Sequence, residues 1–204
     1  MTMPTPTPTL AHHLATMAYN NAWSNHRLLR ACSALSQQDF VATRVSFFPS
    51  LKATLNHNLT VDWYYVDALE RSLRGQPPNP DAARFYTPPE PFDDCASLAA
   101  AQRAVDQRLV DLCAGLTGDD LARPIAVPRR TGVTYTPATR LLAHLFQHQI
   151  HHRGQAHAML AGTSVEPPQL DEFFCANEAH LRAAELAEIG LSEEAIWGPR
   201  GGSR

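Results

Sequence analysis

Four of the ten histidines of this chain lie within nine consecutive positions, at His144, His148, His151 and His152. The residues around them suit a helix, because apolar side chains recur and no proline or glycine interrupts the run before Gly154. In a helix, residues four apart lie one turn apart on one face, so His144/His148 and His148/His152 are both facing pairs. Two imidazoles on one rigid face are a common way to bind a divalent metal ion. We interpret the cluster as one side of a metal site, with a solvated polar face as the alternative.

A single helix supplies only two imidazoles with good geometry, whereas zinc and nickel take three or four ligands. A third ligand must therefore come from a facing element, as in metal sites of helical bundles. His57 is the best candidate, because it lies in a second apolar helical segment, LKATLNHNLTVDWYYVDAL. Asp62 and Asp67 of that segment are candidate ligands or hydrogen-bond partners of an imidazole N–H. The remaining histidines are interpreted as structural or solvated residues: His12, His13, His26, His157 and His180.

Apolar residues at helical spacing predict the elements that would position these side chains. Four long helices are expected over residues 10–35, 50–73, 93–116 and 136–161. A fifth, shorter helix is expected over 169–186. Ser50 and Thr136 are predicted N-caps, and Gly75 is expected to end the second helix. The pattern predicts an all-α fold, an antiparallel four-helix bundle with an additional C-terminal helix.

The segments between and beyond the helices indicate a hairpin and two flexible ends. Residues 125–127 and 133–135 suit short extended segments, joined by a turn at 129–132. Alternating Thr and Pro predict a flexible arm over residues 1–9, and a flexible tail is expected over 191–204. Residues 10–190 are expected to form one domain, because no linker or repeat divides them.

The composition excludes several classes of protein. A chain of 204 residues with 44% hydrophobic content can bury the core of one globular domain. The net charge of -3 offers no basic surplus for a phosphate backbone, so nucleic acid is not an expected partner. No apolar run approaches the roughly 20 residues that span a bilayer. The first residues lack a secretory signal, so we expect a cytoplasmic protein without a membrane partner. The four cysteines are expected to be reduced thiols, with Cys32 and Cys113 in the core.

The histidine-rich segment carries a resemblance to a known family. Residues 148–155 read HQIHHRGQ, which contains a histidine four positions before His-Arg-Gly-Gln, and His57 is an upstream helical histidine. The order of the elements also fits this family. Tyr19, Trp23 and Asn25 lie in the first helix, and a final segment, PPQLDEFF, follows the motif. The chain resembles the DinB-like (damage-inducible) metal-binding four-helix bundles over roughly residues 10–186.

The resemblance implies a metal ion held by His57, His148 and His152, with the remaining coordination positions left to water or substrate. His144 competes as a ligand, because His144/His148 has the same spacing as His148/His152. His151 is expected to line the pocket. Three residues that follow receive other roles: Gln155 as a hydrogen-bond donor behind the ligands, Arg153 as the partner of a carboxylate, and Gly154 as a point of close helix approach.

An open three-histidine site has two direct chemical uses. The metal ion activates water as a nucleophile, or it binds a thiol as thiolate for attack on an electrophile. The resemblance favours transfer of a low-molecular-weight thiol to a small-molecule substrate, with zinc or nickel as the metal and iron as a further candidate. His144 and His151 are candidate proton shuttles, since histidine titrates near neutral pH. A metal-dependent hydrolase and a non-catalytic, metal-stabilised stress-response or interaction protein are the alternatives.

Aromatic residues on the first two helices bear on assembly. Tyr19, Trp23, Trp63, Tyr64 and Tyr65 are more aromatic groups than one small metal pocket needs. Helical bundles of this size often bury a spare apolar face against a twofold mate, so we predict a homodimer. The alternative is that all five belong to the core of one chain.

Overall fold

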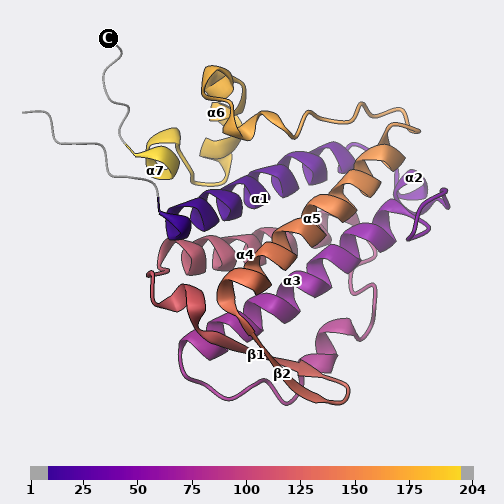
Figure 1. Cartoon of the computed structure of the whole chain (residues 1–204). Coiled ribbons are helices and arrows are strands. Elements are labelled where there is room, and N and C mark those ends of the chain that lie inside the picture. Colours follow the sequence, from indigo (N-terminus) through magenta and orange to yellow (C-terminus); the bar gives the residue numbers. More distant parts are fainter. Residues whose placement is uncertain (1–8, 199–204) are drawn as a thin grey trace, which may run out of the picture.

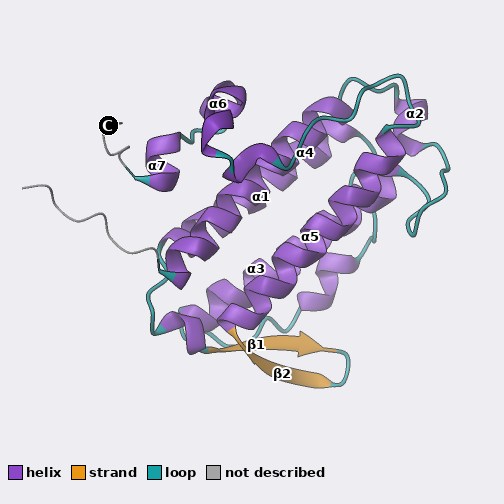
Figure 2. Cartoon of the chain, turned by 45° about the horizontal axis from the view of Figure 1, so that its top comes forward, coloured by secondary structure: helices purple, strands orange, loops and turns teal. Residues whose placement is uncertain are grey.

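The structure is a computed structural model that describes residues 9–198 (Figure 1). Its long helices are antiparallel: α1 (Leu10–Cys32), α3 (Leu51–Leu73), α4 (Cys95–Ala114) and α5 (Ala138–Leu160). Each packs against two others, in the spatial order α1, α4, α3, α5 and back to α1 (Figure 2). The predicted four-helix bundle is confirmed. The pair α3 and α5 thus lies opposite the pair α1 and α4.

Side-chain caps mark where α1, α3 and α4 begin, whereas α5 has none. The Ser50 hydroxyl accepts a hydrogen bond from the Ala53 N–H, which confirms it as the N-cap of α3. Gly75, with a φ of 68°, follows the end of α3 in the left-handed conformation that glycine adopts without strain. The predicted Thr136 cap of α5 is wrong. Thr136 pairs with Ile125 in a strand, and α5 begins after Pro137.

The predicted hairpin is confirmed between α4 and α5. Strands β1 (Pro124–Arg129) and β2 (Gly132–Pro137) are antiparallel, with Arg129 paired to Gly132 across the turn. Ile125 and Val127 on β1 are fully buried and β1 packs against α3, at the lower edge of the bundle in Figure 1. The hairpin leads directly into α5 and so fixes where that helix starts.

The C-terminal segment differs from its prediction. The helix expected over 169–186 is α6 (Ala179–Glu188), preceded by the short 3-10 turns η3 (Glu172–Phe174) and η4 (Ala176–Glu178). The buried Arg182 guanidinium donates to the backbone carbonyls of Glu172 and Cys175, which holds this stretch in turns. Four further short elements lie in the connections and near the C-terminus: α2 (Gln37–Val41), η1 (Ala82–Tyr86), η2 (Asp120–Ala122) and α7 (Glu193–Trp197). The predicted arm, apart from Thr9, and residues 199–204 of the predicted tail lie outside the described residues.

Most of the cysteines and aromatic residues discussed from the sequence are buried in the structure. Cys32 and Cys113 are buried free thiols, as predicted, and Cys95 is also buried. Trp23 is fully buried against Phe173 from the C-terminal segment. Tyr64 and Tyr65 are also buried within the chain, so these aromatics lend no support to the predicted dimer. None of the helices within residues 9–198 combines the length and apolar content of a membrane-spanning helix.

Candidate metal centre

Three histidines from two facing helices converge between α3 and α5. His57 comes from the second turn of α3, and His148 and His152 come from successive turns of α5. One ring nitrogen from each lies within 4.8 Å of those of the other two, and Nε2 of His57 is 3.0 Å from Nε2 of His148. The structure therefore brings together the three residues that the sequence picked out as ligands.

The spacing of these nitrogens suits a first-row divalent ion. Metal–nitrogen bonds of roughly 2.0–2.1 Å in a tetrahedral site separate neighbouring ligand nitrogens by about 3.3 Å. The observed separations, from 3.0 Å to no more than 4.8 Å, bracket that value. The nitrogen of His148 that faces His57 is Nε2, whereas its Nδ1 is buried and has no hydrogen-bond partner. The three residues fit a metal ion without a change of fold.

Gln155 fixes the orientation of one candidate ligand. The Nδ1–H of His152 donates to Oε1 of Gln155 at 2.8 Å, which leaves the His152 Nε2 lone pair free for a metal ion. The Gln155 amide in turn donates to Nε2 of His151 at 3.1 Å. Gln155 contacts His152 as a hydrogen-bond acceptor, whereas the sequence predicted a donor. His151 is exposed and touches the site through Gln155 and through its ring contact with His152.

The electrostatics of the cluster keep the rings neutral. Burial, and then the neighbouring His152, lower the pKa of His57 from 6.5 to about 4. Burial and four nearby histidines lower the pKa of His148 to about 3. Burial also lowers the pKa of His152, against the hydrogen bond to Gln155. Neutral imidazoles at pH 7 have free lone pairs, so protons do not compete with a metal ion there.

Two phenylalanines of the loop before α3 cover the site, and the sequence reasoning missed them. The Phe48 ring lies 4.4 Å from the His57 ring and 5.4 Å from the His152 ring, centroid to centroid. Phe47 lies 6.4 Å from His152 and is 77% exposed. Phe47 and Phe48 lie a few residues before the helix that carries His57. This proximity in the sequence is the signal that could have identified the two phenylalanines.

His144 lies beside the three-histidine group and outside it. Its ring centroid is 6.2 Å from that of His148, and its edge contacts Tyr65 of α3 at 5.3 Å. The competing pair His144/His148 is therefore not the one that meets His57. His144 is exposed, one turn of α5 before the site.

Asp62 does not serve the histidines as predicted. It is buried, and its Oδ2 accepts a hydrogen bond of 2.7 Å from the Gln102 amide of α4. The same amide donates to Asp106, whose carboxyl also accepts from Asn21 and Asn25 of α1. Asp67, the other proposed carboxylate, pairs with Arg71 and Asn79 on the surface side of α3.

Arg153 joins this buried network from α5. Its guanidinium donates to the side-chain oxygens of Asn21 and Asn25, the two residues that also bind Asp106. The predicted pairing with a carboxylate is therefore indirect, through two asparagines. The predicted close helix approach at Gly154 is wrong, because a Cβ built there meets no atom within 4 Å.

The fold and the site together define a four-helix bundle with an all-histidine candidate metal centre between two facing helices. Comparison with protein families gives a match to the DinB family over residues 3–185. The chain belongs to the DinB family. A search of curated proteins found no match.

Proposed function

We propose that this protein is a metal-dependent enzyme that transfers a small thiol to an electrophilic substrate. The supporting observation is the make-up of the site, where within residues 9–198 the ligand group contains three histidines and no carboxylate. Zinc or nickel bound by neutral imidazoles keeps its full charge, and such an ion lowers the pKa of a thiol and favours the thiolate. A site already neutralised by carboxylates would attract an anion less strongly.

The surrounding side chains suit a thiol ligand. Phe48 covers the rings of His57 and His152 with an apolar surface, which keeps water from part of the site. Phe47 at the exposed rim offers an apolar contact to the body of an incoming molecule. Gln155 holds the His152 ring in one tautomer. The lone pair of the His152 Nε2 therefore stays available to a metal ion held between the three histidines.

The thiol proton needs an acceptor, and we assign that role to His144 or His151. Both are exposed and flank the site along α5, with ring centroids 6.2 Å from His148 and 4.8 Å from His152 respectively. The thiol gives its proton to one of these imidazoles, and the sulfur then forms a bond to the electrophilic carbon of the substrate. The leaving group departs with its electron pair, or the electron pair of the attacked double bond moves onto the substrate.

Metal analysis tests the first half of this proposal. Purified protein is expected to contain about one zinc or nickel ion per chain, and His148→Ala is expected to lose most of it. His12→Ala is the matched control, because His12 is an exposed histidine outside the group. Full metal content in His148→Ala would contradict the assignment.

Thiol binding tests the second half. Cobalt-substituted protein is mixed with 2-mercaptoethanol, cysteine or glutathione, and a new sulfur-to-cobalt charge-transfer band is expected in the near ultraviolet. The band should be absent in His148→Ala and present in His12→Ala. A cobalt-loaded protein that gives no band with any thiol would remove the transferase proposal and leave a hydrolytic or non-catalytic metal site.

A further inference from the structure

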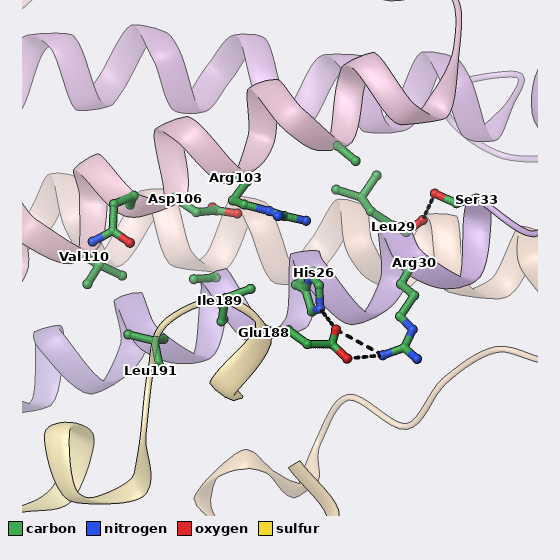
Figure 3. A pocket seen from close by; sticks show the side chains of 13 residues that line it. His26, Leu29, Arg30, Ser33, Arg103, Asp106, Val110, Glu188, Ile189 and Leu191 are labelled. Carbon is green, nitrogen blue, oxygen red and sulfur yellow. Dashed lines mark hydrogen bonds and ion pairs between the residues drawn. The ribbon is translucent and has the colours of Figure 1, made fainter. Parts of the chain in front are cut away.

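A pocket of about 310 Å³ lies against α1 and α4, on the opposite side of the bundle from His57, His148 and His152. Figure 3 shows this pocket from close by. Its walls come from α1, from α4 and from the chain at the end of α6. The volume is at the lower end of the range of small-molecule sites, which fits a ligand of about ten to fifteen non-hydrogen atoms. None of the three candidate metal ligands lines it.

The walls of this pocket are largely apolar. Leu29 and Ala22 face it from α1, Val110 and Ala99 from α4, and Ile189 from the end of α6. Because these residues come from three separate elements, the apolar surface surrounds a ligand on several sides. Such a lining favours a compact hydrocarbon or aromatic body.

The charged groups of the pocket carry a surplus of positive charge. Glu188 accepts hydrogen bonds from Arg30 at 3.0 Å and is 2.9 Å from the His26 ring, so its carboxylate is already engaged. Figure 3 shows Arg103 on the α4 side, across from this group. Arg103 is exposed, and within the described residues 9–198 its side chain has no hydrogen bond or ion pair. One guanidinium therefore faces the pocket without a counter-ion.

Asp106 at the floor of the pocket does not supply that counter-ion. Asp106 is buried, with 5% of the residue exposed, and its carboxyl accepts hydrogen bonds from the amides of Asn21, Asn25 and Gln102. Burial also raises the pKa of Asp106, which reduces its negative charge at neutral pH. The Asp106 carboxyl is thus occupied by hydrogen bonds within the protein, and the charged group without a partner at the pocket is the Arg103 guanidinium.

We propose that this pocket binds a small carboxylate with an apolar body, whose carboxylate pairs with Arg103 and whose body packs against Leu29 and Val110. A planar guanidinium binds a carboxylate through two parallel hydrogen bonds, a geometry that a neutral or cationic ligand cannot reproduce. This site is separate from the metal centre and does not depend on the proposed thiol transfer.

Calorimetric titration of the metal-loaded protein with octanoate tests the proposal, with 1-octanol and octylamine as ligands of matched length. Octanoate is expected to bind at one site, and the two matched ligands at least about tenfold more weakly. Arg103→Gln should weaken octanoate binding by about tenfold or more, and Ala99→Phe should abolish it by filling the pocket. Arg140→Gln, an exposed arginine on α5 outside the pocket, is the matched control and should bind as wild type does.

Metal content and circular dichroism of each variant separate this pocket from the metal centre and from unfolding. Both pocket variants are expected to keep wild-type metal content and helicity while losing octanoate affinity. Absence of octanoate binding to the wild-type protein would overturn the proposal. So would octanoate binding that persists in Arg103→Gln and Ala99→Phe and disappears in His148→Ala, since the carboxylate would then bind at the metal.

Discussion

The substitution Asp106→Asn is expected to flatten the pH dependence of stability above neutral pH. Burial and the neighbouring Asp62 raise the pKa of the Asp106 carboxyl from 3.8 to about 8, against hydrogen bonds from Gln102 and Asn25 and the charge of Arg153. In the unfolded chain this carboxyl loses its proton near pH 4, whereas in the folded protein it keeps the proton until about pH 8. The folded state therefore binds more protons in between, and stability falls as the pH rises through that window.

The size of the effect follows from those two pKa values. Between pH 6.5 and 8, a carboxyl with a pKa of 3.8 unfolded and about 8 folded removes about 2 kcal/mol from the free energy of unfolding. Asp106 is almost wholly buried, so solvent screens its carboxyl only weakly. Asp62, whose pKa burial raises to about 7, contributes about 1 kcal/mol over the same interval, but it remains in the variant. Asparagine also places an N–H₂ group close to the Asn25 amide, a cost of about 1–3 kcal/mol that does not change with pH.

Urea denaturation of both proteins at pH 6.5 and at pH 8 measures this difference. The free energy of unfolding of the variant relative to wild type should rise by about 2 kcal/mol between the two pH values. Asp111→Asn changes an exposed carboxyl of the same helix and is the control, with a constant difference expected. A constant difference for Asp106→Asn as well would refute the reasoning, because Arg153 and the amides would then hold Asp106 ionised.

Three further predictions concern the site, the thiols and assembly. Gln155→Leu removes the acceptor of the His152 N–H and should weaken metal binding by about 10–100-fold in a chelator competition; unchanged affinity would mean that packing alone orients the ring. In the native protein only Cys175 should react rapidly with a thiol reagent, and all four cysteines should react in urea; rapid native labelling of a second cysteine would contradict the buried positions. Light scattering should give about twice the chain mass of 22.5 kDa for the predicted homodimer, and the mass of one chain would reject it.

The parts of the fold that follow from local chemistry were predictable from the sequence. The Ser50 cap, the glycine after α3 and the hairpin before α5 each depend on residues a few positions apart. The helical spacing of His148 and His152 placed two ligands on one face, and that spacing depends only on helix geometry. His57 required the further assumption that its helix faces α5, for which the family resemblance supplied the support.

The features that the sequence did not disclose depend on residues far apart in the chain. Arg182 holds the expected start of the fifth helix in turns by donating hydrogen bonds to two backbone carbonyls. The local sequence around residue 172 does not predict these contacts. Asp62 is a candidate partner of the histidines in the sequence because it shares a helix with His57, but its carboxyl accepts a hydrogen bond from Gln102, 40 residues away. A helical pattern shows which residues share a face, whereas the partner of a buried polar group is set by tertiary packing.

The buried network fixes the rotation of α5 about its own axis, so that His148 and His152 face α3. His148 and His152 are followed directly by Gln149 and Arg153, about 100° further around the helix. Both are buried, and the Arg153 guanidinium donates to Oε1 of Gln149 at 3.4 Å. Arg153 is fixed by hydrogen bonds to Asn21 and Asn25 of α1, and both asparagines bind Asp106 of α4. Apolar contacts alone tolerate small rotations of a helix, but a rotation here would leave a buried guanidinium and a buried carboxyl without partners. The polar core therefore acts on the candidate metal centre through the orientation of α5, which is why contacts between α1 and α4 bear on a site that neither helix touches.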